Sequence, residues 1–153
     1  MLGPVAHVGI TVRDMDRVLA FYQDILGFMV AMDVTIAGEE AERLTRVKGT
    51  ILRSVYLRSG AGVKGPPLEL LQFIEPVMET DAPHAHLRHP GISEIAFWVQ
   101  DIDKTYTDLC AKGVEFYSTP QLFALEGYGK AKAVYLWDPE GTTLELMQMV
   151  KEA

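Results

Sequence analysis

Apolar and polar positions follow the same order in two halves of the chain. Residues 7–16 and 94–103 each hold a short apolar run typical of a strand, followed by an Asp-apolar-Asp step. Apolar residues then recur at helical spacing until Gly27 in the first half and Gly113 in the second. Each half is therefore predicted to begin with a strand and a helix. The apolar helix faces would hold Met15, Val18, Leu19, Tyr22, Ile25 and Leu26, and then Ile102, Tyr106, Leu109 and Cys110.

The two halves also close in the same way. Residues 54–58 precede 67–73, and residues 133–137 precede 143–149, and both closing segments contain Leu-Glu-Leu-apolar-Gln. The predicted fold class is α+β, with two βαβββ modules whose curved mixed sheets enclose a cleft. We assign the modules to residues 1–75 and 91–153 of a single domain spanning 1–153, joined by a proline-containing linker at 76–90.

Strand alternation brings polar side chains to the sheet faces that the helices leave free. Because alternate side chains of a strand point to opposite faces, the register that turns Ile10 toward the helix turns His7 away from it. Glu69 and Glu145 alternate with leucines in the same way, and Glu94 is the repeat's equivalent of His7. One imidazole and three carboxylates in one cleft would repel unless protons or a cation neutralised them. A divalent metal (Zn, Ni, Co, Mn or Fe) is the simplest solution for this donor set.

These motifs resemble the vicinal oxygen chelate superfamily, which includes glyoxalase, methylmalonyl-CoA epimerase, extradiol dioxygenases, fosfomycin-resistance enzymes and bleomycin-resistance proteins. The similarity extends over nearly the whole chain. The segments that carry it are His7–Asp14, Phe21-Tyr22, Leu26-Gly27-Phe28, Leu68-Glu69-Leu70-Leu71, Gly91–Asp103, and Tyr135–Gly141 with Leu144-Glu145-Leu146.

The resemblance implies a metal, wrapped by paired modules, that chelates two oxygens of the substrate. Carried over position by position, His7 looks like the first-strand ligand, Glu69 like the ligand that ends the first module, and Glu145 like the last ligand. Glu94 departs from the pattern, because many family members place a second histidine there. This departure speaks against an oxygen-activating dioxygenase, whose iron site resembles two histidines and one carboxylate.

The leading functional hypothesis is a divalent-metal-dependent enzyme of the glyoxalase or epimerase type, a lyase or isomerase. A carboxylate would remove a proton next to a carbonyl, and bidentate chelation would stabilise the resulting enolate. Glu94 and Glu145 are the candidate catalytic residues; Glu94 is either a fourth ligand or the base, and Glu145 also binds the metal. The alternative is a metal-free protein that binds a drug-like ligand between aromatic walls. An antibiotic-modifying transferase fits the substituted second histidine less well.

Composition bears on partners and location. The chain has 14 Lys and Arg against 21 Asp and Glu, a net charge of −7, and no basic run, which argues against nucleic acid binding. There is no signal-like N-terminus and no apolar run of the roughly 20 residues needed to span a membrane. With a single cysteine, we expect a cytoplasmic protein that acts on a small molecule. The apolar first strand and the family precedent lead us to expect a homodimer.

Other side chains are weaker candidates. The linker histidines and the acidic residues between Gly38 and Gly49 are interpreted as solvated, the latter on a short surface helix, and Cys110 as a small core residue. The residues concerned in the linker and the surface helix are His84, His86, His89, Glu39, Glu40 and Glu42. Candidates for lining the cleft are Trp98, Tyr56, Tyr135, Phe73 and Met147.

Overall fold

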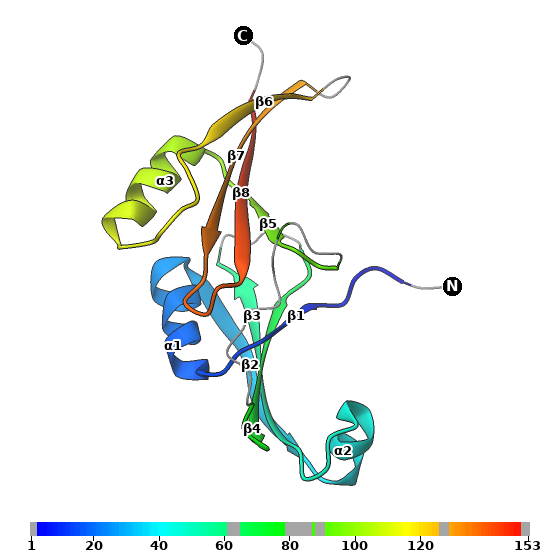
Figure 1. The fold of residues 1–153 in the computed structure, drawn as a ribbon. Helices are drawn as coiled ribbons and strands as arrows, with labels where there is room; N and C mark the ends of the chain where they lie inside the picture. Colours follow the sequence, from blue (N-terminus) through cyan, green and yellow to red (C-terminus); the bar gives the residue numbers. More distant parts are fainter. Residues whose placement is uncertain (1–2, 61–64, 79–86, 88–90, 126–128, 151–153) are drawn as a thin grey trace. The chain divides into compact units, whose positions relative to one another are not determined.

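The computed structural model describes residues 3–60, 65–78, 87, 91–125 and 129–150. The chain divides into two compact units, Met1–Asp81 and Ala82–Ala153, which we call module 1 and module 2 and describe one at a time (Figure 1). None of the helices in these described ranges is long and apolar enough to cross a membrane.

Module 1 contains a four-stranded sheet with the order β1-β4-β3-β2, in which β1 runs parallel to β4 and the other pairs are antiparallel. Helix α1 packs on one face of this sheet beside β4 (Figure 1). The elements are β1 (Val8–Thr11), α1 (Met15–Ala20), the π-helical turn η1 (Phe21–Ile25), β2 (Phe28–Ala37), α2 (Glu39–Thr45), β3 (Ile51–Ser59) and β4 (Leu68–Glu75).

Module 2 repeats the plan with the order β5-β8-β7-β6, and β5 again runs parallel to the closing strand β8. The elements are β5 (Ile95–Trp98), α3 (Ile102–Ala111), β6 (Gln121–Leu125), β7 (Gly129–Trp137) and β8 (Thr143–Val150). The α+β class and the two βαβββ modules are thereby confirmed. The boundaries at 1–75 and 91–153 and the cleft between the sheets stay predictions. Of the proposed linker the structure describes only 76–78 and 87, so His84, His86 and His89 lie outside the described residues.

In each module an aspartate caps the N-terminus of the helix that follows the first strand. Asp14 Oδ1 accepts a hydrogen bond from the Arg17 backbone N–H at 3.1 Å, and the Asp101 side chain accepts one from Lys104 N–H at 2.9 Å. A short carboxylate satisfies a first-turn N–H that has no partner within the helix, and its charge is favoured at the helix N-terminus. The Asp-apolar-Asp step of both halves therefore acts as a helix start.

The glutamine of each closing Leu-Glu-Leu-apolar-Gln motif links the last strand of its module to the segment where the helix begins. Gln72 Nε2 donates to the Arg13 carbonyl at 2.7 Å in module 1. In module 2, Gln148 Oε1 accepts from the Ile102 backbone N–H at 2.9 Å. Both amides therefore link the closing strand to the start of the helix. Gln72 does so through its NH₂ group as a donor, and Gln148 through its carbonyl oxygen as an acceptor.

The first helix differs from the continuous α-helix that its apolar spacing predicts. Leu26 N–H donates to the Phe21 carbonyl, five residues back, so the helix widens into a π-helical turn before Gly27. The wider turn rotates the apolar face. Phe21 is consequently buried with Tyr22, while Ile25 is only half-buried.

The expectation that Cys110 is a core residue is wrong, because its side chain is exposed. Ile102 and Leu109 form the buried stripe of α3, and Tyr106 is half-buried beside it. At about 100° per residue, position 110 falls at the margin of that stripe, and a small side chain there does not reach the sheet.

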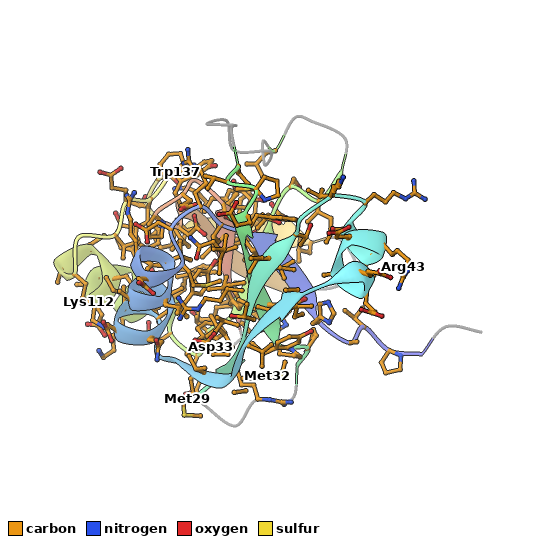
Figure 2. All side chains as sticks on the ribbon, turned by 90° about the horizontal axis from the view of Figure 1, so that it is seen from below. Met29, Met32, Asp33, Arg43, Lys112 and Trp137 are labelled. Carbon is orange, nitrogen blue, oxygen red and sulfur yellow. The ribbon has the colours of Figure 1, made fainter. Side chains whose placement is uncertain are left out.

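Apolar residues on the helix-covered faces form the core of each module. Val12, Val55, Leu57 and Leu70 are essentially inaccessible in module 1, as are Ile102, Leu136 and Leu144 in module 2. The outer strand β2, in contrast, leaves several apolar side chains exposed, including Met29 and Met32, both labelled in Figure 2. The helix between Gly38 and Gly49 is present as α2. Its acidic side chains bond locally, Glu39 and Glu40 to Arg43 and Glu42 to the Gly49 N–H.

Candidate functional site

In module 1 the structure brings His7 and Glu69 into direct contact. His7 immediately precedes β1, and Glu69 lies on β4 opposite Gly9 of the parallel β1. His7 Nε2 and Glu69 Oε2 are 3.0 Å apart. The His7 side chain is 41% exposed and that of Glu69 only 11%, so the imidazole is open to solvent and the carboxylate is buried.

Two further side chains complete the surroundings of Glu69. Ser54 Oγ donates to Glu69 Oε1 at 2.6 Å. Tyr56 is the cross-strand partner of Glu69, and its ring meets His7 edge-on, with Oη 3.5 Å from Nδ1. Burial, and then the adjacent Glu69 carboxylate, raise the pKa of Tyr56. The phenol therefore stays protonated and able to donate.

In module 2 the equivalent position belongs to Glu145. This residue lies on β8 between Ala96 of β5 and Tyr135 of β7, and its exposed fraction is 8%. Burial, and then repulsion from Glu94, raise the pKa of Glu145. Burial and a hydrogen bond to Glu94 raise the pKa of Tyr135 to about 12. Module 2 therefore joins two carboxylates around a protonated phenol.

An aromatic cluster borders this second pair. The ring centroids of Tyr117 and Trp137 are 4.0 Å apart, and the planes of the two rings are inclined at 30°. The ring centroids of Tyr117 and Tyr135 are 5.7 Å apart. Tyr117 Oη lies 3.0 Å from Thr143 Oγ1, at the start of β8. Tyr117 and Trp137 are each 40% exposed, which leaves ring surface open to a ligand. Trp137 is labelled in Figure 2.

Sequence reasoning missed Ser54, Tyr117 and Trp137. Ser54 and Trp137 lie two residues from Tyr56 and Tyr135, so the alternation that places the tyrosines on the site face also places them there. Tyr117 lies outside the predicted strands and had no such signal. Of the proposed lining residues, Trp98 is 67% exposed, and Tyr56, Tyr135, Phe73 and Met147 are half-buried.

Module 1 brings together two side chains of the kinds that bind divalent cations. Two ligands about 2.1 Å from one ion and at right angles to each other are about 3.0 Å apart. His7 Nε2 and Glu69 Oε2 have this separation, which is also that of the ion pair they form with each other. Within either module, the described histidine, cysteine and acidic side chains form no group of three or more that could hold a metal ion. Module 1 contains the pair His7 and Glu69, and module 2 contains the pair Glu94 and Glu145. The ligand roles of His7, Glu69 and Glu145 stay predictions.

A family model now adds independent information. The model described as the glyoxalase/bleomycin resistance protein/dioxygenase superfamily matches residues 6–128, most of the chain. The chain belongs to this superfamily. The match includes His7, Glu69 and Glu94 but ends before Glu145, whose assignment rests on the internal repeat and on the register with Tyr135. No curated protein sequence matches the chain.

Solved structures of the superfamily share the fold. A glyoxalase family protein from Bacillus cereus aligns with a TM-score of 0.81 at 22% identity, covering 99% of this chain and 97% of its own. The trypanothione-dependent glyoxalase I of Leishmania major aligns at 0.61 and 21% identity, covering 94% and 84%. TnmS3, an antibiotic binding protein from Streptomyces, aligns at 0.63 and 18% identity, covering 97% and 98%. The superfamily fold thus supports both catalysis and ligand binding.

Proposed function

We propose that this superfamily member is a divalent-metal-dependent lyase or isomerase that moves a proton next to a substrate carbonyl. The observation that supports the proposal is that His7 Nε2 and Glu69 Oε2 lie 3.0 Å apart, close enough to bind one ion together in place of the ion pair that they form with each other. Glu145, at the register position equivalent to Glu69, is the third proposed ligand. A bound cation would act as a Lewis acid on the substrate carbonyl and acidify the adjacent C–H bond.

The carboxylates of module 2 are suited to take up that proton. A general base works best when its pKa lies near the working pH, and in the metal-free protein burial and then Glu94 raise the pKa of Glu145 toward that range. Tyr135 remains protonated at neutral pH, since its pKa is raised to about 12, and its hydroxyl is a donor for Glu94. Glu145 is therefore our proposed base, with Glu94 as the carboxylate that tunes it or takes its place.

Metal content and solvent proton exchange test this proposal together. Protein purified without chelator should retain a divalent ion, and in D₂O it should incorporate deuterium into some member of a panel of 2-oxo compounds and acyl thioesters. Glu145→Gln should lower the exchange rate by at least about 100-fold. Glu75→Gln is the matched control, because Glu75 is an exposed carboxylate on β4. Substrates that bind but never exchange a C–H proton would overturn the assignment.

The second candidate function is metal-free binding of a flat, drug-like ligand. The half-exposed Tyr117–Trp137 stack favours it, and the antibiotic-binding protein TnmS3 shares the fold. Binding of an aromatic ligand that is unaffected by chelator and by Glu145→Gln, but lost in Trp137→Ala, would favour this function over the enzyme. Loss of binding on chelation would favour the enzyme instead.

A further inference from the structure

The two modules can be compared position by position, because their strand registers are equivalent. Tyr56 pairs with Glu69 across β3 and β4, and Tyr135 pairs with Glu145 across β7 and β8. Two residues earlier on the same faces, β3 carries Ser54 and β7 carries Ala133. The repeat therefore provides a hydroxyl beside one carboxylate and a methyl group beside the other.

The hydroxyl changes what Glu69 can offer. Ser54 is 1% exposed and its Oγ donates to Glu69 Oε1 at 2.6 Å, while Oε2 faces His7 Nε2 at 3.0 Å. A hydrogen bond to one carboxylate oxygen holds the group in one orientation, which directs the other oxygen toward its partner. Ala133 is also buried but has no donor to hold Glu145 in this way.

We propose that Ser54 is a positioning residue, which fixes Glu69 as a one-oxygen ligand beside His7. Module 2 has an alanine at the equivalent position, so Glu145 lacks the hydrogen bond that orients Glu69. The inference rests on the proposed function, and it explains why two carboxylates in equivalent strand positions have different duties. Glu69 holds the cation, and Glu145 combines binding with proton transfer.

Titration of metal-stripped protein with Ni²⁺, followed by calorimetry, tests this role without any substrate. Ser54→Ala should weaken Ni²⁺ binding by about 10–100-fold, the usual effect of removing a group that orients a metal ligand. Ser54→Thr keeps the hydroxyl and a strand-compatible side chain, and should restore most of the affinity. In a Glu69→Gln background, Ser54→Ala should cause no further loss, because the group it orients is gone.

Three results separate the outcomes. Wild-type affinity in Ser54→Ala, with the wild-type protein binding Ni²⁺ normally, would overturn the positioning role and leave the metal site intact. No Ni²⁺ binding by wild-type protein would overturn the proposed function, and the inference with it. Equal losses in the Ala and Thr variants, with lowered thermal stability of both metal-free proteins, would show that Ser54 only packs the sheet.

Ala133→Ser is the reciprocal variant. It adds to module 2 the hydroxyl that module 1 already has, at the equivalent register position. Ni²⁺ affinity should change less than about 3-fold, while proton exchange should fall by about 10-fold or more as Glu145 becomes fixed. An unchanged exchange rate in a folded Ala133→Ser protein would contradict the assigned difference between the two glutamates.

Discussion

The buried side chain of Glu145 makes the stability of the folded protein depend on pH. Burial and the charge of Glu94 raise the pKa of Glu145 in the folded protein above its ordinary value of about 4.3. A raised pKa means that the folded state binds the proton more tightly than the unfolded state does. The associated stability is complete below the unfolded pKa and is lost as the pH rises through the folded pKa.

Glu145→Gln should therefore stabilise the metal-free protein at pH 7 by up to about 1 kcal/mol, since it removes a buried charge and its repulsion from Glu94. The gain should shrink as the pH falls toward 4, where wild-type Glu145 is protonated. Urea unfolding at both pH values, with chelator present, measures the difference. Glu75→Gln, at an exposed position, should change little at either pH, and a variant less stable than wild type at pH 7 would contradict the argument.

Among the secondary-structure elements, the closing strands do more than complete the sheets. Gln72 and Gln148 each reach from the last strand to the start of the module's helix, one as a donor and the other as an acceptor. An amide has both groups, whereas a carboxylate only accepts at neutral pH. Replacing each glutamine with glutamate therefore separates the two roles at nearly constant shape.

Gln72→Glu should destabilise the protein by about 0.5–1.5 kcal/mol, because it removes the donor of an exposed hydrogen bond and places a charge against the Arg13 carbonyl. Gln148→Glu keeps an acceptor at the N-terminus of α3, where negative charge is favourable, and should cost less than about 0.5 kcal/mol. Denaturant midpoints of the two variants give the comparison. Equal effects would mean that packing, and not hydrogen bonding, makes glutamine suitable at these positions.

The secondary-structure elements, and the face of each strand that packs on a helix, could be predicted from the sequence better than the contacts between strands. Period-2 alternation and two aspartate caps suffice for the βαβββ plan, and the helix-covered face of β1 follows from Val8 and Ile10. The Ser54–Glu69 bond depends on the register between β3 and β4, to which Ser54 itself gives no clue. The π-helical turn was missed because apolar spacing does not distinguish a bond to the fifth residue back from one to the fourth.

For the whole molecule, the proposed ligands come from both modules, His7 and Glu69 from the first and Glu145 from the second. Binding that is specific to the folded protein stabilises it by mass action, by about 2.7 kcal/mol at a free ion concentration 100 times the Kd. Under the proposed function all three residues bind one ion, so the stabilisation by that ion would depend on each of them.

Chelator should therefore lower the Tm of the wild-type protein, and added Ni²⁺ should restore it. His7→Ala and Glu145→Gln should each abolish most of the Ni²⁺-dependent shift, and the double variant should lose no more than the stronger single variant. Thermal unfolding with and without Ni²⁺ measures these shifts. Additive losses, with each single variant keeping about half of the shift, would mean that the modules bind separate ions.

Each four-stranded sheet comes from one uninterrupted stretch of chain, and this bears on how the protein is made. The strand β4, which pairs with β1 and β3, ends at Glu75, and Glu145 follows it about 70 residues later in the sequence. At roughly 5–20 residues per second, that interval lasts about 4–14 s, long compared with the pairing of strands. The nascent first half can thus set His7 against Glu69 while Glu145 has yet to be synthesised.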